Sequence, residues 1–174
     1  SRIRLAAALD ADDIATVLAD DVDEVVRIEW DTSKDDVVER TDRRLGNMRL
    51  GEAVRRAPPG EATTAALLDR VRATRLAVLG WSAASMSLRE RVSFLHRSLG
   101  EPWPDWSVDA LVRTLDEWLA PYLPGATGRA DLERLDVATV LRSQLPWPVG
   151  GDLDDLAPPM LALPVGRTVP IDYR

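Results

Sequence analysis

Apolar and polar residues alternate in the first third of the chain. In the segment DEVVRIEW, residues 23–30, the alternation places Val26, Ile28 and Trp30 on one face. A period of two is typical of a strand with one buried face and one solvated face. We therefore expect a half-buried strand over residues 23–30.

The strand pattern extends on both sides of this segment. VVERTDRRLGNMRLGE, residues 37–52, predicts one or two further strands, interrupted near Gly46 and Asn47, which favour a turn. Upstream, IRLAAAL at residues 3–9 predicts a strand, and ADDIATVLA at residues 11–19 predicts a short helix. The N-terminal part of the chain is thus predicted to be a small antiparallel β unit.

The spacing of apolar residues changes at APPGE, residues 57–61. A proline pair followed by glycine marks a boundary, and beyond it the apolar period is about 3.6 residues, as in an amphipathic helix. Residues 61–75 predict a first helix, with Gly80 as a candidate stop. Ser82 or Ser87 is expected to cap the next helix.

That next helix carries its apolar residues on more than one side. Leu88, Val92, Leu95 and Leu99 form one stripe, whereas Phe94 points away from it. The helix is therefore expected to pack against neighbours on two sides.

The clearest helical pattern covers residues 108–119, where apolar residues recur at helical spacing behind a capping serine. Asp109 and Arg113 are expected to pair on its outer side. In the following LDEWLAPYLPG, Trp118 lies on the buried stripe and Tyr122 just past it, before prolines that end the helix. We interpret these aromatic residues as a packed helix end rather than a ligand platform.

Shorter helices and a hairpin complete the pattern. Residues 129–135 and 136–145 predict two helices, the second capped by Asp136, and GDLDDLAPP predicts another helical turn that opens at Asp152. MLALPVGRTVPIDYR suits an edge strand or a short hairpin around Gly166, because its two internal prolines cannot donate to a sheet.

The predicted fold class is α+β. A small N-terminal antiparallel β unit occupies residues 1–56, a mainly helical domain residues 57–157, and a short strand-like segment residues 158–174. We interpret the last segment as the start of a further stretch of chain beyond Arg174.

Composition excludes several kinds of site. With 45% apolar and 29% charged residues the balance is ordinary for a globular domain, and with no cysteine and a single histidine a zinc site is not expected. No apolar run reaches the roughly 18–20 residues that cross a bilayer. Acidic residues soon follow the first apolar run, which argues against a secretory signal. We expect a cytoplasmic protein without a membrane partner.

Charge is distributed unevenly along the chain. The net charge of −7 argues against a surface devoted to nucleic acid. Residues 1–38 carry 11 acidic and 4 basic residues, whereas residues 39–56 carry 3 acidic residues and 6 arginines. An Arg-rich solvated strand face is one interpretation of this basic stretch. The other is a phosphate-contacting patch, for which the candidates are Arg40, Arg43, Arg44 and Arg49.

The sequence shows no catalytic signature, and no catalytic, cofactor-binding or metal-binding residue is predicted. A phosphate-binding loop ends in lysine and then serine or threonine, but the only lysine, Lys34, precedes an aspartate. Nothing brings His96 to a serine and an aspartate. The acidic run 152–155 lacks the glycine and the closing glutamate of a calcium loop. Trp103 and Trp106 are expected to clamp a loop onto the core.

Several segments resemble, in the same order, the region that follows the motor in HrpB-type bacterial DEAH-box ATP-dependent helicases. The segments are VRIEWD, RRLGNMRL, WSAASMSLRERVSFL, WPDWSVDALVRTLDEWLAPYL, LPWP, LDDLAPPMLALPVG and IDYR. Together they span nearly the whole chain. LDEWLAPYL and LAPPMLALPVG are the most distinctive.

The resemblance implies two RecA-like motor lobes upstream of Ser1, which would bind ATP, Mg²⁺ and nucleic acid. The residues up to about position 50 would be the end of an OB-like β region, and the rest the helical start of the family's C-terminal domain. The partners it implies are the motor lobes of the same parent chain and single-stranded RNA.

Three functional hypotheses follow. The first is a non-catalytic accessory region of an RNA helicase, which braces the motor or extends its nucleic-acid channel. The second is a protein-interaction domain, favoured by the acidic net charge. The third, a free-standing hydrolase, would need His96 or a pair of carboxylates in a pocket.

Overall fold

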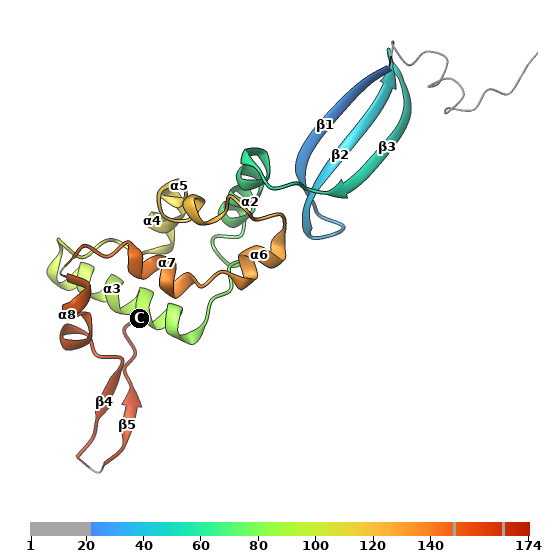
Figure 1. Cartoon of the computed structure of the whole chain (residues 1–174). Coiled ribbons are helices and arrows are strands. Elements are labelled where there is room, and N and C mark those ends of the chain that lie inside the picture. Colours follow the sequence, from blue (N-terminus) through green and yellow to red (C-terminus); the bar gives the residue numbers. More distant parts are fainter. Residues whose placement is uncertain (1–21, 148, 165) are drawn as a thin grey trace, which may run out of the picture.

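The computed structural model describes residues 22–147, 149–164 and 166–174, and it shows a three-stranded sheet followed by helices and a short hairpin (Figure 1). The first sheet is an antiparallel meander in the order β1-β2-β3. Its strands are β1 (Val22–Asp31), β2 (Asp36–Leu45) and β3 (Met48–Arg56). This confirms the α+β prediction. The strand and the helix predicted over residues 3–9 and 11–19 lie outside the described residues.

The middle of the chain is helical. The longer helices are α2 (Glu61–Ala73), α3 (Ala83–Leu99) and α8 (Val149–Leu156). The shorter ones are α4 (Val108–Arg113), α5 (Leu115–Trp118), the 3₁₀ turn η2 (Ala120–Tyr122), α6 (Arg129–Arg134) and α7 (Val137–Ser143). Strands β4 (Met160–Ala162) and β5 (Thr168–Pro170) pair as an antiparallel hairpin, which confirms the turn predicted at Gly166. No helix in the described part of the chain is long and apolar enough to cross a membrane.

The sheet projects from the helices as an arm, hereafter the sheet arm, residues 22–56 (Figure 1). The β2–β3 turn lies at Gly46 and Asn47, as predicted, and Gly46 has a φ of 55°, a conformation that glycine adopts at no steric cost. Ile28 and Trp30 pack against the helical core, but Val26 is 56% exposed, contrary to prediction. The helices cover only the base of the sheet. The alternation of apolar and polar residues in β1 therefore extends beyond the part of the strand that the helices bury.

A set of polar contacts fastens the base of the arm to the helices. Asp35, in the β1–β2 turn, accepts hydrogen bonds from Arg70 of α2, at 3.0 Å, and from Arg129 of α6. Asp36 Oδ1 accepts the backbone N–H of Arg129 at 2.6 Å. A Cβ atom on Gly128 would lie 2.8 Å from this carboxylate oxygen, so the approach requires glycine. These residues, Asp35, Asp36, Arg70, Gly128 and Arg129, form the joint between the arm and the helices.

Helix α3 begins at a capping box formed by Ser82, one of the two serines that were predicted as its cap. The Ser82 side chain accepts the N–H of Ser85, and the Ser85 side chain accepts the N–H of Ser82. The helix packs on two sides, because Leu88 and its neighbours in the stripe are buried while Phe94 contacts the ring of Tyr173, 5.1 Å away between centroids. Leu99 is an exception at 58% exposed, since it lies in the last turn of the helix.

The helix predicted over residues 108–119 is divided at Thr114. The hydroxyl of Thr114 donates to the carbonyl of Ala110 at 3.0 Å, a local bond that competes with helix continuation, and its φ and ψ of −104° and 19° depart from helical values. Trp118 is nevertheless buried, and its indole N–H donates to the carbonyl of Leu111 at 2.8 Å. Tyr122 donates to or accepts from Ser143, 2.8 Å away. The packed helix end is confirmed for Trp118, whereas Tyr122 is 43% exposed and contacts Ser143 at the surface.

Two local predictions were wrong. Asp109 pairs with Arg75 of the α2–α3 connection at 2.6 Å instead of with Arg113. Gly80 does not end a helix, because α2 stops at Ala73. It lies where the backbone of α6 passes closely: a Cβ atom there would lie 1.9 Å from the carbonyl oxygen of Glu133. Glycine at this position permits packing rather than a turn.

A buried arginine connects α3 to α8. Arg91 is 4% exposed, and its guanidinium donates to the carbonyls of Ala157, at 2.5 Å, and Leu153, at 3.2 Å, and to the carboxylate of Asp154. Leu153 lies in the last turn of α8, where its carbonyl also accepts the N–H of Ala157, and Ala157 directly follows the helix. Helix α8 itself begins at Val149, earlier than the predicted Asp152.

Replacing Arg91 with Ala is expected to lower the free energy of unfolding by about 2–4 kcal/mol, because the buried carbonyl of Ala157 loses its donor and the buried side chain leaves a cavity. Urea denaturation followed by circular dichroism measures this change. The control is Arg134→Ala, whose side chain is 72% exposed and pairs with Asp131 in the same helix, and whose cost is expected to be below about 1 kcal/mol. Equal losses in the two variants would contradict the structural role of Arg91.

Candidate functional site

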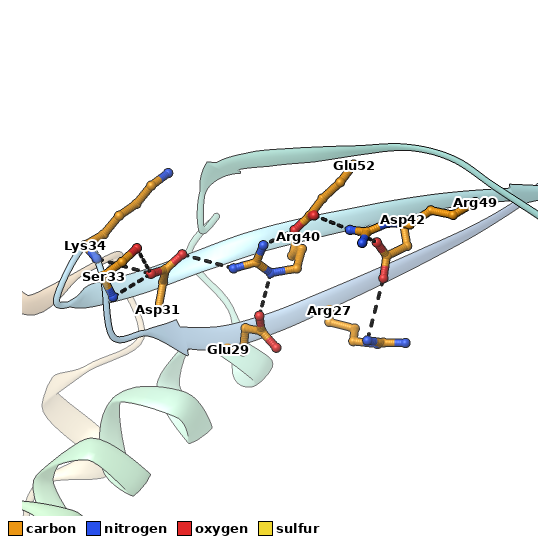
Figure 2. Close-up of polar contacts among 9 residues, drawn as sticks. All are labelled: Arg27, Glu29, Asp31, Ser33, Lys34, Arg40, Asp42, Arg49 and Glu52. Atoms are coloured by element: carbon orange, nitrogen blue, oxygen red, sulfur yellow. Dashed lines mark hydrogen bonds and ion pairs between the residues drawn. The ribbon is translucent and has the colours of Figure 1, made fainter. Parts of the chain in front are cut away.

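The four arginines predicted as phosphate contacts lie on the sheet arm, and the pleat divides them between its two faces. In β2, Arg40 and Arg44 point to one face, and Arg43 points to the other. Arg49 on β3 is the register partner of Arg44. The face that carries Arg40, Arg44 and Arg49 also carries carboxylates from all three strands, and is hereafter the charged face (Figure 2).

Arg40 lies at the centre of the charged face. Its Nε donates to Glu29 at 2.6 Å and its Nη2 to Asp31 at 3.0 Å, both on β1, while Nη1 donates to Glu52 on β3 (Figure 2). The hydrogen bond to Glu29 is the main cause that raises the pKa of Arg40 above its ordinary value. The guanidinium is thus held by carboxylates of both neighbouring strands.

The ion pairs continue along the same face beyond Glu52. Arg49 donates to Glu52 and, at 3.1 Å, to Asp42, a carboxylate whose side chain is only 7% exposed. Arg27 lies 3.7 Å from the other oxygen of Asp42. The network contains three arginines, Arg27, Arg40 and Arg49, and four carboxylates, those of Glu29, Asp31, Asp42 and Glu52. A phosphate at its centre would meet more negative than positive charge.

The remaining two arginines have different surroundings. Arg43, on the opposite face, lies 3.3 Å from Glu24 of β1. Arg44 is exposed and, among the described residues, has no carboxylate within 4 Å. The predicted set is therefore not one patch. Of these four arginines, only Arg44, beside the partly exposed Arg49, presents a guanidinium that the described carboxylates do not neutralise.

Asp31 anchors the turn at the base of the charged face. It accepts hydrogen bonds from the backbone N–H and the hydroxyl of Ser33, at 2.9 and 2.6 Å, and from the N–H of Lys34 at 3.1 Å (Figure 2). These bonds, with the charge of Arg40, lower the pKa of Asp31 from 3.8 to about 2. The carboxylate is thus ionised at every pH at which the protein would function.

The other candidates from the sequence are structural. Trp103 and Trp106 are buried, which confirms the predicted clamp, and His96 Nδ1 lies 2.7 Å from the carbonyl oxygen of Trp103. In the described part of the chain, histidine, aspartate and glutamate do not gather in a group of three that could hold a metal ion. Trp147, at 94% exposed, is an aromatic side chain that the sequence pattern did not single out.

Comparisons with known proteins agree with this architecture. The family model described as "ATP-dependent helicase C-terminal" of HrpB matches residues 118–174. The ATP-dependent RNA helicase HrpB of Escherichia coli (strain K12) is 27% identical over 175 residues, which cover 100% of this chain and 22% of that protein. Over its whole length the chain is thus similar to a C-terminal region of the HrpB type.

Two solved structures show that the similarity extends to the fold. The crystal structure of the E. coli DExH-box NTPase HrpB matches with a TM-score of 0.65 and 26% identity, over 95% of this chain and 20% of that chain. A second crystal structure, of the Escherichia coli DEAH/RHA helicase HrpB, gives a TM-score of 0.64 and 26% identity over 88% and 20%. The chain thus spans about a fifth of the length of the proteins that it matches.

Acid is expected to weaken the sheet arm through Asp31. Because the folded pKa of about 2 lies below the ordinary value of 3.8, ionised Asp31 stabilises the fold above about pH 4, and this contribution is lost as the pH falls toward 2. Melting temperatures measured between pH 5 and pH 2 should fall less steeply for Asp31→Asn than for the original chain. Parallel curves for the two proteins would contradict this assignment.

Arg40 and Arg44 are expected to respond differently to replacement by Ala. Arg40→Ala leaves Glu29, Asp31 and Glu52 without their shared cation, so it should lower the melting temperature clearly, whereas Arg44→Ala should leave it nearly unchanged. Differential scanning calorimetry of both variants checks this. A larger effect of Arg44→Ala would show that the ion pairs of Arg40 do not hold the arm.

Proposed function

We propose that this chain is a non-catalytic accessory part of an ATP-dependent RNA helicase and that it braces the motor lobes of the same parent chain. The observation that carries the proposal is the construction of the sheet arm. The arginines at the centre of its charged face are paired with carboxylates of the same face, and its base is fastened to α2 and α6 at the joint. Such an element suits mechanical support better than phosphate binding.

In this proposal the chemistry of the helicase lies in the motor lobes. ATP and Mg²⁺ would bind there, as the resemblance implies, and no residue of this region is assigned a catalytic role. The protruding arm and the C-terminal hairpin extend from opposite sides of the helices (Figure 1). In this proposal both would contact other parts of the parent protein.

Extension of the nucleic-acid channel is a second candidate function. The observation that favours it is that Arg44 and Arg49 lie opposite each other on neighbouring strands, at the end of the arm far from the helices. Arg44 has no described carboxylate partner, so a phosphate could reach it without displacing one. Arg40 and Arg43 would contribute less, since each is already paired.

Docking of a separate protein partner is the alternative from another functional class. The net charge of −7 favours it, as does the fully exposed indole of Trp147, because exposed aromatic side chains often anchor protein interfaces. In this case the region would bind neither RNA nor the motor.

The bracing proposal is tested by mixing the chain with the purified motor lobes of its parent helicase and measuring complex formation by calorimetry at low and moderate salt. We expect a complex whose affinity changes little with salt, because packed surfaces rather than phosphate contacts hold it. A chain that is folded but does not bind the motor would overturn the proposal and leave the docking alternative.

The channel function has its own test, a titration of labelled single-stranded RNA into the chain at two salt concentrations. If the arm contacts RNA, Arg44→Ala should reduce the salt slope by about 0.7, the value for one phosphate contact on a single strand. The fourfold variant of Arg40, Arg43, Arg44 and Arg49 to Ala should be checked for folding first, because Arg40 supports the sheet. An unchanged slope in Arg44→Ala would exclude the channel function at this position.

A further inference from the structure

A row of polar side chains follows one side of α3, outside the sheet arm. Arg89, Ser93 and Arg97 are spaced by four residues, which places them one above another on the helix surface. They line a hollow of about 220 Å³, hereafter the α3 hollow. The C-terminal residues Tyr173 and Arg174 and the helix cap Ser107 line it from other segments of the chain.

The α3 hollow differs from the charged face in its charge balance. Three arginines line it, Arg89, Arg97 and Arg174, against a single carboxylate, that of Glu90. Arg174 is paired with Asp172 at 2.7 Å. Within the described residues, neither Arg89 nor Arg97 has a carboxylate within 4 Å, whereas Arg40 of the sheet arm has three.

Neutral contacts hold these two guanidinium groups in place. Arg89 lies over the ring of Trp81, 5.4 Å from its centroid. Arg97 Nη2 donates to the carbonyl of Tyr173 at 3.1 Å. Because a guanidinium carries five N–H donors, one such contact leaves most of them for a ligand.

The tail that closes the α3 hollow is itself fixed. The Tyr173 hydroxyl donates to the carbonyl of Pro158 at 2.8 Å, and its ring packs on Phe94 of α3. Trp106, buried at 3% exposed, forms part of another wall. The cations are thus presented by a framework that does not depend on a ligand for its shape.

We propose that the α3 hollow binds a phosphate group, held by Arg89 and Arg97 with the hydroxyl of Ser93 as a further donor. The planar guanidinium fork matches the oxygens of phosphate, and charge-assisted hydrogen bonds of this kind are the strong ones. The phosphate can come from a single-stranded nucleic-acid backbone or from a small free phosphate. The proposal is independent of the bracing role, since α3 does not contribute to the joint.

The test is to titrate the 174-residue chain separately with inorganic phosphate and with a short single-stranded RNA at low salt, by calorimetry. The variant Arg89→Gln/Arg97→Gln is expected to bind about tenfold more weakly or worse, because hydrogen bonds to charged groups are lost. The control is Arg75→Gln/Arg134→Gln, which removes the same charge from exposed arginines that do not line the α3 hollow. It should bind nearly as well as the original chain.

A second variant, Ser93→Glu, separates ligand binding from folding. Its carboxylate would lie between the two arginines, where it should repel phosphate while leaving the melting temperature equal or higher. If RNA binds much more tightly than phosphate and both variants lose this binding, the ligand is a nucleic-acid backbone. If only phosphate binds and the same variants lose it, the ligand is a small anion. Either result supports the α3 hollow. Absence of binding, or binding unaffected by both variants, overturns it.

Discussion

The arrangement of this protein depends on the contacts of two adjacent aspartates, Asp35 and Asp36, at the turn between β1 and β2. A three-stranded meander has little core of its own, and most of its surface is solvated. The turn aspartates receive Arg70 from α2 and both the side chain and the backbone of Arg129 from α6. Through these bonds the sheet base is held where Val37 and Ala57 join the helical core.

The joint also explains the position of two glycines. Gly128 lets the start of α6 reach Asp36, and Gly80 lets the end of the same helix pass the α2–α3 connection, where Glu133 would otherwise collide with a side chain. Both ends of α6 are therefore in backbone contact with neighbouring segments. A helix of six residues gains little from its own hydrogen bonds, so these tertiary contacts define it.

Much of the fold could be predicted from the sequence where one local rule decides. The turn at Gly46, the cap at Ser82 and the cap at Asp136 are set by residues within a few positions of each other. The predictions failed where distant chain segments decide. The sequence near Val26 or Leu99 does not indicate that the neighbouring elements end before they cover these side chains. The division of the helix at Thr114 accompanies a hydrogen bond from its hydroxyl to a backbone carbonyl.

The candidate site shows the same distinction in its electrostatics. Residues 39–56 form the most basic stretch of the chain, but their first part, in β2, lies beside the acidic β1. The sequence alone does not state which carboxylate meets which arginine. The strand register could have been drawn from the turns, and it would have placed Glu29 and Asp31 on the face of Arg40. A cluster of arginines along the sequence is thus a weak sign of a cationic surface when part of the segment forms the central strand of a sheet.

The contrast between β2 and α3 has a geometric cause. A residue on a central strand has cross-strand neighbours on both sides, at about 4.5–5.5 Å between Cβ atoms, so a charge there readily meets opposite charges from two strands. On the outer side of a helix the neighbours are the residues three and four positions away. Between Arg89 and Arg97 that position is held by Ser93, which adds no charge. Helix α3 therefore carries fewer arginines than the sheet arm, but their guanidinium groups are not neutralised. Whether a surface attracts an anion depends on the residues that lie between its cations.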